Sequence, residues 1–186
     1  MKTVEIIGAN AHERFEKTRI ACRGIIIENG QILLTYEENT DQWFIPGGGL
    51  EGDETLAQCC IRELAEETGF LVSVGEHFLT LEEYYAEWRY ESHYFVCERV
   101  GETERKLTEG EKKAGLVPRW MDLSAAVETF SRHQEYAQIS EMKRGGYLRE
   151  YKALLAFLEV YAKYTSGSLY SRDKEKDGES FWKNSD

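Results

Sequence analysis

The chain has 186 residues, of which 41% are hydrophobic and 31% charged, proportions typical of a globular protein with one sizeable core. Its 34 acidic and 23 basic residues give a formal net charge of −11, which repels nucleic-acid backbones and anionic lipid surfaces. Without a signal-peptide pattern or an apolar run of about 20 residues, we expect a cytoplasmic protein that binds neither nucleic acid nor membrane.

Two β-strands are expected near the start of the chain, at residues 19–27 (RIACRGIII) and 31–36 (QILLTY). The Asn29-Gly30 dipeptide between them is the strongest short signal for a hairpin turn. Residues 43–46 (WFIP) predict a short extended piece, because the residue before a proline prefers extended geometry. A glycine-rich loop should follow, and then a helix from Glu54 or Thr55 to a stop at Gly69.

The second half of the chain predicts three further strands and two helices. Residues 71–85 and 88–100 are rich in aromatic and β-branched side chains, which favours two long strands joined by a bend. Residues 116–123 (LVPRWMDL) predict an edge strand, since Pro118 cannot donate to a central ladder. A helix is expected at residues 123–132, capped by Asp122 or Ser124, and a longer one with a single packed face at residues 147–164.

These elements predict one domain over residues 19–164, preceded by an N-terminal segment (1–18) and followed by a polar, mobile tail (165–186) in which Phe181 and Trp182 could dock locally. Four cysteines show no zinc-ligand spacing, and two of them are adjacent on the first helix and point in different directions. We expect all four to be buried, reduced thiols: Cys22, Cys59, Cys60 and Cys97.

The first helix carries an unusual concentration of acids. Glu63, Glu66 and Glu67 stand at positions i, i+3 and i+4, so they share roughly 100° of helix surface within about 6 Å of axial rise. Like charges this close destabilise a helix, and the C-terminal end of the macrodipole adds to the cost. The pattern fits either a solvated acidic face or a face that binds a hard cation such as Mg²⁺, which prefers oxygen ligands.

The spacing of the whole stretch favours the cation. Gly48, five residues, Glu54, seven residues and then residues 62–70 (RELAEETGF) form a segment that resembles the complete signature of the Nudix hydrolase family. The resemblance implies an α/β fold, namely a Nudix-type α/β/α sandwich around a mixed sheet, here with an added C-terminal helix. It also implies metal-dependent hydrolysis, with Mg²⁺ or Mn²⁺, of the diphosphate linkage in a nucleoside diphosphate derivative. A bound cation would explain how so acidic a chain holds a polyanion.

The same resemblance implies a role for each acid of the signature. Glu63 and Glu67 would be the principal metal ligands, with Glu66 as a third ligand or as the base that activates water. The Gly48 region would supply a backbone carbonyl, and Arg62 would orient the glutamates. Glu54, the first glutamate of the signature, would assist the metal or brace the loop. The expected catalytic set is therefore Glu54, Arg62, Glu63, Glu66 and Glu67.

Candidates outside the signature have no fixed spacing to support them. Aromatic side chains could stack on a base and arginines could meet phosphates, which suggests a set of substrate-binding residues: Arg23, Trp43, Tyr84, Tyr85 and Arg89. The family often uses one more acid, for which Glu109 and Glu111 are preferred and Glu98 stands behind them. For each of these acids, the alternative of a solvated loop carboxylate is favoured by the absence of a fixed spacing. His93 is expected to be structural.

The substrate stays open at this stage. Pro46 and Pro118 are the only prolines, so the proline submotifs of ADP-ribose and NADH hydrolases are missing. Nucleoside triphosphates, nucleotide sugars and dinucleoside polyphosphates remain as small-molecule substrates, and a homodimer remains open as an assembly. Two alternatives use the same fold: a diphosphate isomerase, which would need a reactive cysteine, and a catalytically silent nucleotide-binding sensor or regulator.

Overall fold

The computed structural model describes residues 2–176, with side chains placed as far as residue 162. Its strands are β1 (Lys2–Ile7), β2 (Lys17–Ile25), β3 (Ile27–Glu28), β4 (Gln31–Glu37), β5 (Gln42–Phe44), β6 (Gly47–Gly49), β7 (Phe70–Tyr85), β8 (Trp88–Glu102) and β9 (Leu116–Asp122). Its helices are α1 (Leu56–Thr68), α2 (Glu109–Ala114), α3 (Leu123–Ser131), the 3₁₀ helix η1 (Arg132–Tyr136) and α4 (Glu141–Lys176).

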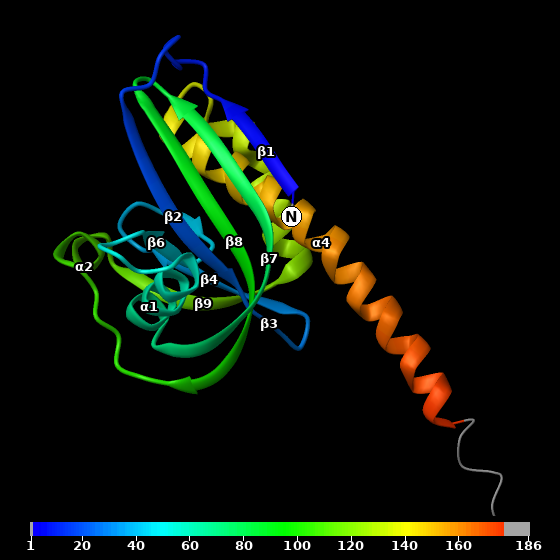
Figure 1. The fold of residues 1–186 in the computed structure, drawn as a ribbon. Coiled ribbons are helices and arrows are strands. Elements are labelled where there is room, and N and C mark those ends of the chain that lie inside the picture. Colours follow the sequence, from blue (N-terminus) through cyan, green and yellow to red (C-terminus); the bar gives the residue numbers. More distant parts are fainter. Residues whose placement is uncertain (1, 177–186) are drawn as a thin grey trace, which may run out of the picture.

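Two sheets form the framework (Figure 1). The five-stranded sheet has the order β1-β7-β8-β2-β6. It is mixed, because the β1–β7 and β8–β2 pairs are parallel, whereas the β7–β8 and β2–β6 pairs are antiparallel. In the other sheet, β4 pairs antiparallel with β3, β5 and β9. The strand with Pro118 has β4 as its partner within the described residues, which confirms the expected edge position.

Helices cover both faces of this framework (Figure 1). α1 packs over β2 and β7 on one side, and α3, η1 and α4 pack together on the other. Consecutive residues of β4 show the layering, since Leu33 belongs to the core beneath α1 and Leu34 to the core beneath α4. The mixed α/β architecture that the resemblance implied is therefore confirmed.

The predicted limits of α1 and of the long hairpin are also confirmed. The Thr55 side chain caps α1 by accepting from the Gln58 N–H, and the Gln58 side-chain oxygen accepts from the Thr55 N–H. Gly69 ends the helix in the left-handed region with φ 77°. Ala86, with φ 46°, makes the bend between β7 and β8. Burial of all four cysteines as free thiols agrees with the sequence.

The single strand expected at residues 19–27 is wrong. The Asn29-Gly30 turn exists, with φ 50° and 79°, but only β3 pairs with β4 across it. β2 ends at Ile25 and lies between β8 and β6 in the other sheet. The chain changes sheets because the two adjacent isoleucines are both buried, Ile25 in the core beneath α4 and Ile26 in the core beneath α1.

The loop expected after Pro46 is also partly wrong, because Gly47–Gly49 forms strand β6, antiparallel to β2. A side chain at Gly47 is impossible there: its φ is 139°, and a Cβ would lie 2.1 Å from the Cys22 carbonyl oxygen. Glycine is thus the residue that lets β6 approach β2 this closely.

Two further elements were not predicted from the sequence, and one helix is longer than predicted. β1 pairs with β7 although residues 1–18 predicted no strand, and α2 forms inside the polar stretch before β9. α4 begins at Glu141 and continues to Lys176, so the first part of the expected tail is helical. Residues 177–186, with Phe181 and Trp182, lie outside the described residues. No helix within residues 2–176 combines the length and apolar character needed to cross a membrane.

Candidate active site

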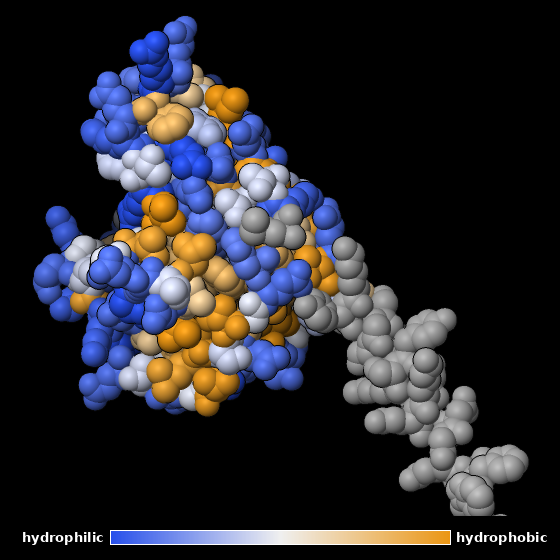
Figure 2. Space-filling model, viewed as in Figure 1, coloured by the Kyte–Doolittle hydropathy of each residue, from blue (hydrophilic) through white to orange (hydrophobic). Residues whose placement is uncertain are grey.

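α1 and β6 bring the acids and glycines of the signature together. Glu63 and Glu67 are each only 8% exposed, because both turn from α1 toward the glycine strand. The Gly47 N–H donates to Glu67 Oε2 at 2.9 Å. A Cβ on Gly48 would lie 2.5 Å from Glu63 Oε2, so the missing side chain is what makes room for this carboxylate. Figure 2 shows hydrophilic side chains over α2 and the adjoining part of α1, with a hydrophobic patch beside them.

Arg62 joins the remaining acids into one network. Its Nε and Nη2 donate to the two oxygens of Glu54 at 3.0 and 2.6 Å. Nη1 donates to Glu63 Oε1 at 2.9 Å and to Glu66 Oε2 at 3.2 Å, and Nη2 also donates to the Gly49 carbonyl at 2.9 Å. The guanidinium therefore orients three glutamates relative to the glycine strand, a geometry that a lysine could not reproduce.

The electrostatic environment divides these acids into two kinds. Hydrogen bonds from Arg62 hold the pKa of Glu54 down at about 2. Burial raises the pKa of Glu63, against the opposing effect of Arg62, and burial raises the pKa of Glu67 to about 8, against the Gly47 N–H and the charge of Arg23. Glu63 and Glu67 are carboxylates whose charged forms lack sufficient positive charge nearby.

The donor chemistry of this site fits a hard divalent cation. Carboxylate oxygens and a glycine carbonyl are the ligands that Mg²⁺ and Mn²⁺ prefer, and the open space at Gly48 adjoins Glu63. Within residues 2–176, no three His, Cys, Asp or Glu side chains already converge closely enough to hold a metal, since Arg62 lies between Glu63 and Glu66. Glu63 and Glu67 are the residues that would hold the ion.

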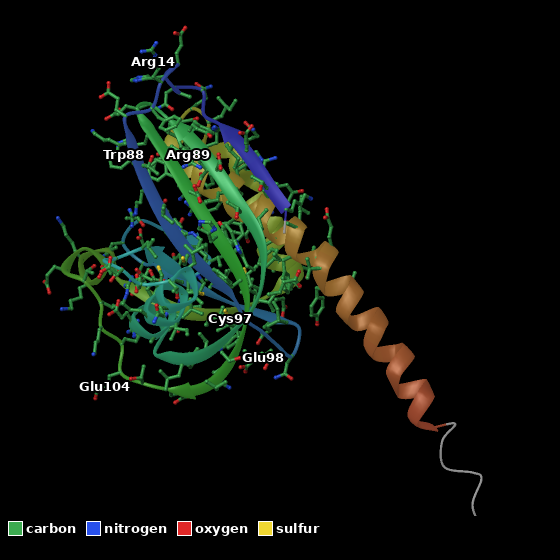
Figure 3. The ribbon with its side chains drawn as sticks, viewed as in Figure 1. Arg14, Trp88, Arg89, Cys97, Glu98 and Glu104 are labelled. Atoms are coloured by element: carbon green, nitrogen blue, oxygen red, sulfur yellow. The ribbon has the colours of Figure 1, made fainter. Side chains whose placement is uncertain are left out.

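The candidates for an additional acid separate in the structure. Glu111 closes the capping box of α2 by accepting from the Thr108 N–H at 2.7 Å, and its charge contributes to the raised pKa of both Glu63 and Glu67. Glu109 is 91% exposed and pairs with Lys112. Glu98 is exposed on β8 (Figure 3). Of the three acids, Glu111 is the one that acts electrostatically on both buried glutamates.

The substrate-binding candidates are scattered over the molecule. Arg23 lies beside the start of the glycine strand, since its Nη1 donates to the carbonyl of Ile45, two residues before β6 begins, at 2.8 Å. Trp43 lies on β5 against Tyr36, with ring centroids 4.4 Å apart. The other three candidates lie near the tip of the β7–β8 hairpin, where Figure 3 shows Arg89: Tyr84, Tyr85 and Arg89.

Contacts at the hairpin tip engage all three of these side chains. Arg89 pairs with Glu82 at 2.8 Å and Glu91 at 2.6 Å, and Tyr84 donates to Glu82. Tyr85 packs so closely against Gly8 and Gly145 that a Cβ on either glycine would lie 2.2 Å from its side chain. His93 is 7% exposed and bonds to Glu91, as a structural residue would.

A second charged cluster, which the sequence reasoning missed, lies beneath α4. Glu150 is completely buried; its Oε1 accepts from Arg149 at 2.6 Å and its Oε2 from the Tyr94 hydroxyl at 3.0 Å. Glu83 Oε2 lies 3.5 Å from Arg149 Nη1, and Arg23 Nη1 lies 3.8 Å from Glu150. One signal was present: Glu150 falls three residues after buried Tyr147, on the packed face of the helix.

Comparisons with known proteins agree with this geometry. The NUDIX domain family matches residues 18–142. A putative 8-oxo-dGTP diphosphatase of Bacillus subtilis is 25% identical over 121 residues, 65% of this chain and 76% of that protein. A Nudix hydrolase structure from Nitrosomonas europaea, 23% identical with a TM-score of 0.52, covers 59% of this chain and 75% of its own, which indicates a shared fold.

Two other similarities are confined to short segments. The m7GpppN-mRNA hydrolase of Saccharomyces cerevisiae is 42% identical over 57 residues, 29% of this chain. The match spans only 6% of that yeast protein's length. The RNA pyrophosphohydrolase of Xanthomonas campestris is 42% identical over 50 residues, 26% of this chain and 24% of that protein.

Proposed function

The chain belongs to the NUDIX domain family of hydrolases, and we propose that it uses Mg²⁺ or Mn²⁺ to cleave the diphosphate linkage of a small nucleoside diphosphate derivative. Water would attack phosphorus in a nucleoside triphosphate, a nucleotide sugar or a dinucleoside polyphosphate. One observation carries this proposal. Glu63 and Glu67 are buried carboxylates that face a glycine strand without enough positive charge to neutralise them.

Each signature residue has a task in this proposal. Glu63, Glu67 and the Gly48 carbonyl hold the cation, which neutralises the diphosphate and lowers the pKa of water when bound. Arg62 fixes the orientation of Glu63 and Glu66 through its Nη1. Glu66, whose side chain is 36% exposed, can reach the solvent and accept the proton of the attacking water, or serve as a third ligand.

Two more acids support these residues. Glu54 braces the glycine turn, because its Oε1 accepts from the Glu51 N–H at 2.8 Å while both oxygens hold Arg62. Glu111 is the additional acid we propose, on the strength of its electrostatic effect on Glu63 and Glu67. It lies on α2, outside the signature.

A small-molecule substrate is favoured over RNA. The relatives named for RNA or mRNA hydrolysis are similar to this chain over only 50 and 57 residues. The net charge of −11 opposes contact with a long polyanion, whereas a bound cation can neutralise one diphosphate group locally. The longer similarity, to the putative 8-oxo-dGTP diphosphatase, is compatible with a nucleotide substrate.

Hydrolysis tests this proposal directly. A panel of nucleoside triphosphates, nucleotide sugars and dinucleoside polyphosphates is incubated with Mg²⁺, with Mn²⁺ and with chelator, and products are separated by chromatography. We expect metal-dependent products, a fall in kcat on the order of 10²-fold or more in Glu67→Gln, and little change in Glu104→Gln, an exposed acid outside the site. Tight binding without turnover across the panel would reject hydrolysis and favour a silent nucleotide sensor.

A further inference from the structure

Arg23 connects β2 to the backbone beside the candidate metal site. Its Nη1 donates to the Ile45 carbonyl at 2.8 Å and lies 3.4 Å from the Gly47 carbonyl. The N–H of the same Gly47 donates to Glu67 Oε2. Arg23 thus holds both ends of the short turn that presents this N–H to Glu67.

The same Nη1 atom of Arg23 also faces α4. Glu150 lies 3.8 Å from Arg23 Nη1, with the Arg23 side chain 12% exposed and the Glu150 side chain fully buried. Two further groups hold the Glu150 carboxylate: Arg149 on the same helix, and the hydroxyl of Tyr94, which is the register partner of Arg23 on β8. A buried carboxylate held on three sides is a fixed point, because moving it would leave a charge unpaired.

Arg23 itself is incompletely satisfied in this position. Its Nε is buried and has no hydrogen-bond partner, although the neighbouring Nη1 is within reach of three acceptors. A single nitrogen, Nη1, therefore faces both Glu150 on α4 and the carbonyls beside β6, while Nε is left unsatisfied. That is the arrangement expected of a group that sets the distance between two elements.

We propose that Glu150 and Arg23 form a positioning relay, through which α4 sets the Ile45–Gly47 backbone and thereby the orientation of Glu67. The relay rests on the proposed function in one respect, namely that Glu67 acts on the bound metal. The family match ends at residue 142, so Glu150, on α4, lies beyond the matched residues. In this proposal both members act as positioning residues, through the backbone that holds Glu67.

Kinetics of matched variants test the relay. Glu150→Gln keeps the shape of the side chain and removes its charge, and Glu83→Gln makes the same change in the same buried cluster at an acid whose ion-pair partner is Arg149. We expect kcat to fall about tenfold in Glu150→Gln with KM within about twofold, because misplacing a catalytic group slows chemistry more than it weakens binding. The kinetics of both variants are measured well below the midpoint temperature of their thermal unfolding. Equal losses in the two variants would refute the relay.

Substitutions at Arg23 separate positioning from general stability. Arg23→Met removes charge and donors and should lose at least as much kcat as Glu150→Gln, whereas Arg23→Lys keeps a charged donor and should recover most of it. The double variant Glu150→Gln/Arg23→Met should be no slower than Arg23→Met alone, since both changes interrupt one route. Multiplicative losses in the double variant would contradict a shared route.

Hydrogen exchange at the Gly47 amide gives a readout that needs neither metal nor turnover. We expect its exchange, followed by NMR, to be at least about fivefold faster in Glu150→Gln and unchanged in Glu83→Gln, because the bond to Glu67 opens more often. Unchanged exchange in Glu150→Gln overturns the relay. Faster exchange in a protein that hydrolyses nothing in the panel keeps the relay and rejects the proposed function. Should Glu150→Gln not fold, Arg23→Lys and Arg23→Met decide by the same measurement.

Discussion

The two charged clusters of this protein differ in their charge balance. The signature cluster contains four acids, Glu54, Glu63, Glu66 and Glu67, and one base, Arg62. The cluster beneath α4 contains two of each: Glu83, Glu150, Arg23 and Arg149. Only the first therefore has an excess of negative charge that a cation could neutralise.

The two clusters also differ in solvent exposure, and the signature cluster is the more exposed one. Glu150 is fully buried, and Glu83 is 2% exposed, whereas Glu66 in the signature cluster has 36% of its side chain exposed. A balanced cluster without solvent contact can serve as an internal support, and an unbalanced one that reaches solvent can receive a metal and a phosphate. Charge balance together with exposure thus separates a structural role from a catalytic one more clearly than the number of acids does.

The largest effect expected from this difference is on stability. Arg149→Met should lower the free energy of unfolding by about 3–5 kcal/mol, because it leaves Glu83 and Glu150 buried without their nearest cation. Glu66→Gln, in the unbalanced cluster, should change it by roughly 0.5 kcal/mol or less, since its pair with Arg62 is partly solvated. Urea unfolding measures both. An Arg149→Met variant as stable as the parent would show that the α4 cluster does not support the fold.

The two clusters also differ in how far the sequence predicts them. The signature acids fall within residues 54–67, on one helix and the turn before it, so helical geometry alone places Glu63, Glu66 and Glu67 together. The members of the α4 cluster come from β2, β7, β8 and α4. Tyr94 meets Arg23 only because β8 lies beside β2 in a particular register, which no local pattern reveals.

The errors in secondary structure have similar causes. Gly47–Gly49 forms a strand against the usual preference, because Gly47 approaches β2 too closely for a side chain at that position. β2 and β3 were merged because two neighbouring buried isoleucines hide a change of sheet. α2 did have a local signal, the Thr108-x-x-Glu111 capping box, but a helix of six residues has no apolar period to reinforce it.

Metal binding should change the free energy of unfolding by less than Arg149→Met does, and it should depend on the signature cluster alone. Mg²⁺ at about 100 times its Kd should stabilise the protein by roughly 2.7 kcal/mol, since the ion binds the folded state. Glu63→Gln/Glu67→Gln should lose this increment, and Glu83→Gln should keep it. Chemical unfolding with Mg²⁺ and with chelator supplies the comparison. An increment that survives in the double variant would place the cation elsewhere.

Gly48→Ala should lower the stability by about 1 kcal/mol or less without metal, because its Cβ would meet the movable end of Glu63 rather than backbone. That carboxylate must rotate away, so the Mg²⁺ increment should shrink markedly. Gly49→Ala is the matched control: it keeps the carbonyl that binds Arg62, and its Cβ would lie 3.5 Å from Arg19, an ordinary contact. The two variants would be compared by unfolding at the same Mg²⁺ concentration. If both kept the full increment, the space at Gly48 would have no part in holding the ion, and the excess charge of the signature cluster would have to be neutralised from its solvent side.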